Sequence, residues 1–183
     1  ADEPLMEPAG NALPSDPAPT NEGSIQIPGG IIGTNYTVTT ADGVTKVTLT
    51  GNISLKQAWT ISKNETVILD LAGHTLTADE NVVAIKNEGS LTIQDSKENG
   101  GKVSGLRGAD NYGILTLEGG TITTTDTTGA GGCVFMRGDN AAFYVKGGQI
   151  KPENSSLSAI GFRTENLSNI TLSLAVSYTH LTL

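Results

Sequence analysis

The sequence predicts an all-β solenoid, in which each coil lays its short strands beside those of the coil before it. Three observations predict this fold class. Short apolar segments recur every 22 to 28 residues, most clearly at residues 114–123, ILTLEGGTIT. Glycine-rich bends follow most of them. The spacing is too short for a helix and a strand in every unit, so the repeats favour strands alone.

Two apolar columns define the repeat. In each copy they are separated by one residue, so their side chains point to the same face of a strand. Both columns advance by identical steps, which predicts two inward-facing rows of one parallel sheet. The first column is Val47, Leu69, Leu91, Leu115, Phe143 and Ile170. The second column is Leu49, Leu71, Ile93, Leu117, Val145 and Leu172.

A third apolar column follows the second, and in four of its five copies Gly-Gly or Ala-Gly lies between them. It predicts a second strand per coil, which begins after a bend where glycine tolerates positive φ. The members of this third column are Ile53, Leu76, Val103, Ile122 and Ile150.

Four pieces of the repeat resemble known proteins: LDLAGHTLT (69–77), VAIKNEGSLTIQDS (83–96), NYGILTLEGGTIT (111–123) and NAAFYVKGGQI (140–150). They are similar to the pectate-lyase-like superfamily, and more closely to coil repeats of large bacterial surface proteins. The resemblance implies a right-handed, single-stranded parallel β-helix of about six coils over residues 44–175.

The segments before the coils have two different characters. Residues 1–23 hold five of the seven prolines among polar residues, which predicts a disordered linker. Residues 24–43 carry short apolar runs broken by glycines. Because an open end of a β-helix exposes core and strand edges, we expect residues 24–43 to form the N-terminal cap.

The last eight residues, VSYTHLTL (176–183), resemble a translated sequencing adapter. The coils run up to this segment without a capping sequence. We therefore expect residues 176–183 to be an artefact and the native solenoid to continue further.

The composition argues against nucleic acid and against a membrane span as partners of this chain. The net charge is −8 and the isoelectric point about 4.6, so the chain has no basic stripe for nucleic acid. No apolar run approaches a membrane span. The single cysteine, Cys133, excludes an internal disulfide framework and is expected to be a small buried hydrophobic residue. We expect a monomer without cofactor or metal, secreted or on a bacterial cell surface, with no signal peptide in this chain.

Asparagines recur shortly before the first apolar column, and we expect them to stack as a structural ladder at one corner of the solenoid. They are Asn87, Asn111, Asn140 and Asn166.

Three arginines precede these asparagines, with acidic residues between them. They predict either a row of surface ion pairs, which is the favoured interpretation, or a groove that binds an anionic sugar. The arginines are Arg107, Arg137 and Arg163, and the acids are Asp110, Asp139 and Glu165.

The resemblance sets criteria for catalysis. A lyase of this superfamily would carry a calcium-binding carboxylate cluster with an Arg base, and a hydrolase an Asp-Asp pair; the sequence has neither pattern. The leading hypothesis is therefore a non-catalytic stalk or adhesin-like scaffold that binds a glycan, a host surface or a cell-wall surface weakly. The alternative is a fragment of a polysaccharide lyase or glycoside hydrolase whose active site lies outside this fragment.

Overall fold

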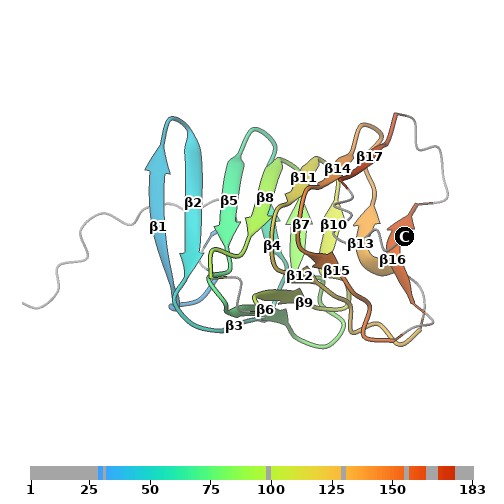
Figure 1. Cartoon of the computed structure of the whole chain (residues 1–183), viewed down its shortest axis with the longest axis horizontal. Helices are drawn as coiled ribbons and strands as arrows, with labels where there is room; N and C mark the ends of the chain where they lie inside the picture. Colours follow the sequence, from blue (N-terminus) through green and yellow to red (C-terminus); the bar gives the residue numbers. More distant parts are fainter. Residues whose placement is uncertain are drawn as a thin grey trace, which may run out of the picture.

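A computed structural model describes residues 29–30, 32–97, 100–128, 131–154, 157–163 and 169–175. Within these ranges the chain forms strands and no helix, and the strands stack as a parallel β-solenoid of about five turns (Figure 1). The predicted all-β solenoid is confirmed. The predicted linker, residues 1–23, and the adapter-like residues 176–183 lie outside the described ranges.

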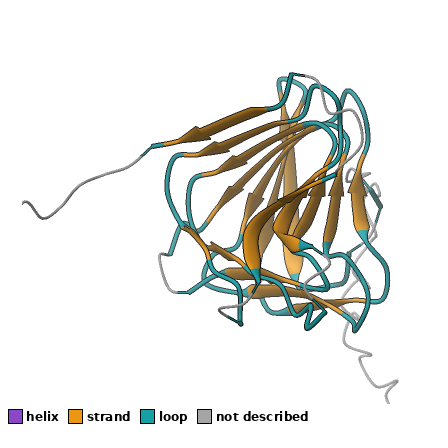
Figure 2. Cartoon of the chain, turned by 90° about the vertical axis from the view of Figure 1, so that its right-hand side faces the viewer, coloured by secondary structure: helices purple, strands orange, loops and turns teal. Residues whose placement is uncertain are grey.

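Three sheets surround one interior, as the view turned by 90° shows (Figure 2). Buried apolar side chains fill this interior. The first, here sheet A, has seven strands in the order β1-β2-β5-β8-β11-β14-β17, and all neighbours except β1 and β2 are parallel. Its strands are β1 (Tyr36–Ala41), β2 (Val44–Leu49), β5 (Thr66–Asp70), β8 (Ser90–Gln94), β11 (Ile114–Leu117), β14 (Ala142–Val145) and β17 (Thr171–Leu174).

The other two sheets are wholly parallel and have five strands each. Sheet B contains β3 (Ile53–Leu55), β6 (Thr75–Ala78), β9 (Lys102–Ser104), β12 (Thr121–Ile122) and β15 (Gln149–Ile150). Sheet C contains β4 (Trp59–Ile61), β7 (Ile85–Asn87), β10 (Ala109–Asn111), β13 (Gly132–Met136) and β16 (Ser158–Phe162). The prediction of about six coils counted one apolar segment for each of the six parallel strands of sheet A. Sheets B and C have five strands each, so the solenoid completes about five turns.

The inward columns make the core. The third predicted column is confirmed, because sheet B aligns its members one above the other. The first four of them are at most 5% exposed. Burying such continuous apolar rows is the main source of stability in a stack of this kind.

The register of sheet A differs from the prediction at two steps. Between β5 and β8, Leu69 aligns with Ile93 and Val67 with Leu91. Between β14 and β17, Phe143 aligns with Leu172. Each difference is a shift of two residues. Such a shift keeps every apolar side chain on the inward face, so hydrophobic alternation alone cannot detect it.

Sheet C was not predicted as a separate sheet. Its inward positions mix apolar side chains such as Ile85 and Val134 with Asn87 and Asn111, all fully buried, so the polar asparagines interrupt its apolar pattern. Only two residues join β7 to β8, Glu88 and Gly89, and two join β10 to β11, Tyr112 and Gly113.

At the N-terminal end, β1 pairs antiparallel with β2 along its whole length. Ile32 joins the core at 5% exposure, and Gly29 lies so close to Trp59 that a Cβ would come within 2.5 Å of its ring. These elements belong to residues 24–43, where we expected a cap.

Candidate functional site

The outer surface of sheet C gathers the three arginines of the chain. Cross-strand pairing aligns Lys86 with Asp110, Asp110 with Phe135, and Phe135 with Gly161 in one row. The residue that directly follows each of these strands continues the alternation as a second row, which contains Glu88, Tyr112, Arg137 and Arg163. We call this surface the arginine face; it comprises Lys86, Glu88, Arg107, Asp110, Tyr112, Phe135, Arg137 and Arg163.

Asp110 joins two of these arginines. Arg107 donates from Nε to Oδ1 at 2.5 Å and from Nη2 to Oδ2 at 3.2 Å, as a two-pronged contact. Arg137 Nε lies 2.7 Å from the same Oδ2, but without hydrogen-bond geometry, so this contact is an ion pair. The Arg107 side chain is 14% exposed, that of Arg137 is 27% exposed and that of Asp110 is 11% exposed. Because they are largely shielded from water, the attraction between these charges is screened less than in a surface ion pair.

An aromatic ring lies among these charges. The guanidinium carbons of Arg107 and Arg137 are 5.4 and 4.7 Å from the centroid of Phe135, within cation–π range. The ring extends over Gly161 of the next coil, where a Cβ would come within 2.5 Å of it. Gly161 therefore makes room for Phe135, a contact that sequence reasoning missed.

The neighbouring coil continues the pattern. Lys86 Nζ lies 2.6 Å from Glu88 Oε1 and 5.4 Å from the centroid of Tyr112. The hydrogen bond to Glu88 raises the pKa of Lys86, so it stays charged at neutral pH. Tyr112 is 37% exposed.

The structure places the six predicted edge residues unequally. Arg107 and Arg137 both form ion pairs with Asp110. Arg163 follows β16 and lies one coil beyond Arg137, with its backbone N–H donated to Met136 O at 3.1 Å. Asp139 is exposed in the turn after β13, and Glu165 lies outside the described residues.

Two of the four predicted ladder residues stack. Asn87 Nδ2 donates to Asn111 Oδ1 at 2.8 Å and to Ile114 O at 2.9 Å. Asn111 Nδ2 repeats the pattern one coil on, donating to Ala142 O at 2.9 Å. Both asparagines are fully buried. The ladder holds the turns between sheets C and A together.

The other two asparagines are not seen in that ladder. The position aligned with Asn111 in the next coil is Met136, whose sulfur lies 3.7 Å from Asn111 Nδ2. Asn140 lies exposed in the turn four residues further on, because that turn is longer and displaces it from the stack. Asn166 lies outside the described residues.

The corner between sheets A and B contains a carboxylate that sequence reasoning had left unassigned. Asp70 is 2% exposed and accepts hydrogen bonds from Ala72 N, Gln94 Nε2 and Ser96 N at 3.0 to 3.1 Å. Lys46 Nζ lies 3.1 Å away. Burial acts to raise the pKa of Asp70, but the hydrogen bonds from Ser96, Gln94 and Lys46 outweigh it and lower the pKa to about 2.

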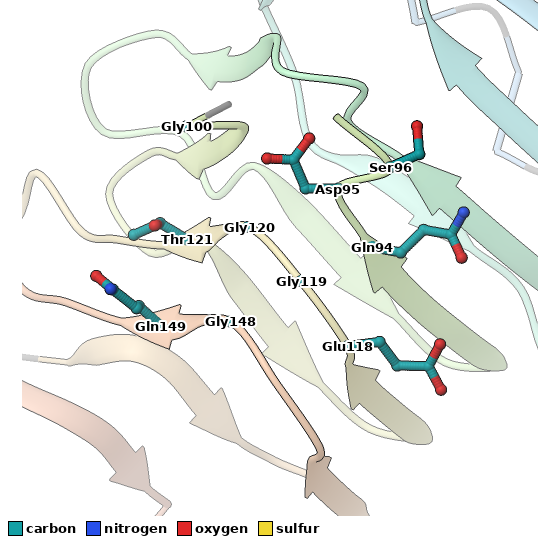
Figure 3. A pocket seen from close by; sticks show the side chains of 10 residues that line it. All are labelled: Gln94, Asp95, Ser96, Gly100, Glu118, Gly119, Gly120, Thr121, Gly148 and Gln149. Atoms are coloured by element: carbon teal, nitrogen blue, oxygen red, sulfur yellow. The ribbon is translucent and has the colours of Figure 1, made fainter. Parts of the chain in front are cut away.

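Asp95 has a similar role one coil later. Its two oxygens accept the backbone N–H groups of Gly73 and Gly101 at 2.6 and 2.8 Å, so it ties two coils together. It borders a hollow of about 690 Å³ on the outside of the corner. Figure 3 shows Gln94 and Glu118 on one side of the glycine turn and Thr121 and Gln149 on the other.

The single thiol of the chain lies inside the solenoid. Cys133 is buried, and burial raises the pKa of its thiol to about 11, so it is a poor nucleophile. In the part of the chain that the structure describes, no three His, Cys, Asp or Glu side chains lie close enough to hold a metal ion.

The same part contains no helix of the length and hydropathy that a membrane span needs.

Comparison with known proteins gives no relative. No family model matches the sequence, and no curated protein or solved structure matches it either.

Proposed function

We propose that this chain is a non-catalytic scaffold segment, a stalk or adhesin-like rod of a secreted or bacterial cell-surface protein. The observation that carries the proposal is the use of polar side chains at the corners of the coils. Asp70, Asp95, Asn87 and Asn111 are buried, and each binds backbone or side-chain groups of an adjacent coil. Such contacts favour a rigid stack.

The stack has the geometry of a spacer. Parallel strands of neighbouring coils lie about 4.8 Å apart, so every added coil lengthens the rod by that amount. Since each coil contacts only its neighbours, length can change by whole coils without altering the rest. The acidic, polar composition supports an extracellular location.

The arginine face supports weak binding as a second part of this role. Asp110 already neutralises part of the charge of Arg107 and Arg137, so a ligand competes with an internal partner. The ordered charges and the Tyr112 ring nevertheless offer a fixed surface that a scaffold can display.

Duplication of one coil tests the spacer role. Residues 90–113 span β8, β9 and β10 and end where Ile114 takes the register position of Ser90. A protein with these residues repeated is expected to fold and to gain about 5 Å in maximum dimension by small-angle X-ray scattering. A misfolded product or an unchanged length would argue against a modular rod.

An activity assay separates the scaffold from the lyase or hydrolase alternative. The purified chain is incubated with a panel of acidic and neutral polysaccharides, and reducing ends and unsaturated uronates are measured. We expect no turnover above a heat-denatured control. Turnover that heating abolishes would overturn the non-catalytic proposal.

A further inference from the structure

We propose that the arginine face binds an extended acidic segment of a partner protein. The proposal builds on the scaffold role, because a scaffold displays such a face in a fixed geometry. It concerns binding and not turnover, so the two proposals can fail separately.

Charge is distributed unevenly over the molecule. The arginine face contains four cations, Lys86, Arg107, Arg137 and Arg163, against two carboxylates, Glu88 and Asp110. It thus has a positive excess, whereas the other residues that the structure describes contain seven Lys and Arg side chains and ten Asp and Glu side chains. A positive surface on an otherwise acidic molecule attracts and orients an anionic partner.

The arrangement of the cations indicates an extended ligand. Lys86 lies on β7 and Arg163 directly follows β16, which is three strand steps away in sheet C. At about 4.8 Å per step these positions lie about 14 Å apart along the solenoid axis. An extended peptide rises about 3.3 Å per residue, so four or five residues would span the face.

The side chains of the face favour a protein over a sugar. Arginine and tyrosine are enriched at protein–protein hot spots, and arginine clusters recognise acidic motifs. Tyr112, at 37% exposure, and Ile114, at 46%, flank Gly113 at the border of the face. Their apolar surface suits peptide side chains. Asp139 lies in the exposed turn after β13, two residues after Arg137, and is a third carboxylate next to the face.

Internal contacts hold the face in shape before a ligand arrives. Asp110 fixes Arg107 and Arg137, and these guanidinium groups lie beside the ring of Phe135. Lys86 is similarly placed by Glu88 and Tyr112. Side chains that are already ordered lose little conformational entropy on binding.

The experiment measures the anisotropy of fluorescein-labelled hexaglutamate with the whole chain at about 50 mM and about 200 mM NaCl. Hexaserine and a labelled hexagalacturonate serve as comparison probes. We expect hexaglutamate to bind and hexaserine not to bind. We also expect hexaglutamate to bind more tightly than hexagalacturonate, and its affinity to fall at the higher salt concentration.

Three variants locate the binding. Arg163→Gln and Lys86→Gln are each expected to weaken hexaglutamate binding about fivefold, by losing one exposed charge contact. Lys146→Gln is the matched control, because Lys146 is also paired with a glutamate, Glu118 at 3.3 Å, but on sheet A. It should leave the affinity within twofold of the parent chain. If Arg163→Gln lowers the melting temperature, its loss of binding could come from unfolding, and the comparison of Lys86→Gln with Lys146→Gln then decides the test.

Three results would overturn the proposal. Equal weakening by Lys146→Gln would show unspecific attraction, and no binding of hexaglutamate would remove the site. Tighter binding of hexagalacturonate, lost in Lys86→Gln, would assign the face to an acidic glycan. None of these results bears on turnover, so the scaffold proposal would be judged by its own assays.

Discussion

Asp70→Asn should destabilise the solenoid strongly for a change of one atom. In the folded chain the Asp70 carboxylate accepts hydrogen bonds from Ala72 N, Gln94 and Ser96 N and lies 3.1 Å from Lys46 Nζ. An asparagine keeps one acceptor oxygen, but its NH₂ group would replace the other oxygen and face N–H groups that need an acceptor. It also removes the charge that attracts Lys46.

The magnitude follows from the pKa. The pKa of Asp70 is lowered from 3.8 to about 2 on folding, so the ionised form is favoured by about 2 kcal/mol in the folded state. This contribution is fully present above the unfolded pKa and is lost as pH falls through the folded pKa. It therefore disappears between about pH 4 and pH 2. Because Asp70 is 2% exposed, solvent screening reduces the value little.

Urea unfolding gives the assay, with the fluorescence of Trp59 as the probe. Trp59 is the single tryptophan and is 2% exposed in the core. At pH 7 the variant should lose about 2 kcal/mol of unfolding free energy, and the difference from the parent chain should shrink toward pH 2. Asp42→Asn is the control, since Asp42 is exposed in a turn at φ 51, which asparagine tolerates. A loss at pH 7 below about 0.5 kcal/mol, or a difference independent of pH, would refute the reasoning.

Three further predictions concern the core, the asparagine ladder and the thiol. Leu117→Asp buries an unpaired charge in a fully buried column and should abolish cooperative thermal unfolding, whereas Ile114→Asp, at a position 46% exposed on the same strand, should not. If Leu117→Asp melts like the parent chain, the assigned inward face is wrong. Asn87→Ala removes two hydrogen bonds to the next coil and should cost about 2 kcal/mol in urea unfolding, while Asn140→Ala, at an exposed turn, should cost under about 0.5 kcal/mol. Equal losses would show that the ladder adds nothing specific. Cys133 should resist a disulfide thiol reagent at pH 8 until the chain is unfolded, because it is buried and its pKa is about 11; rapid labelling of the folded chain would contradict this.

The candidate site was only partly visible in the sequence. The spacing of Arg107, Arg137 and Arg163 indicated one side of the solenoid, and the structure does bring all three to sheet C. The sequence could not show that Asp110 binds two of them, or that Phe135 lies between them. Those contacts cross from coil to coil, and their partners are set by register.

The sequence by itself determined the fold class, because a strand repeat needs only inward apolar columns and bends, and both are local features. The tertiary structure alone decided the strand register at Ile93 and Leu172, where the pairing is shifted by two residues from the predicted one. A two-residue shift preserves the apolar face, so the choice between registers depends on turn lengths and on contacts such as Asp70 with Gln94. The same holds for Asn140, which the length of its turn moves out of the ladder, and for sheet C, whose buried asparagines are stable only when the next coil supplies their partners.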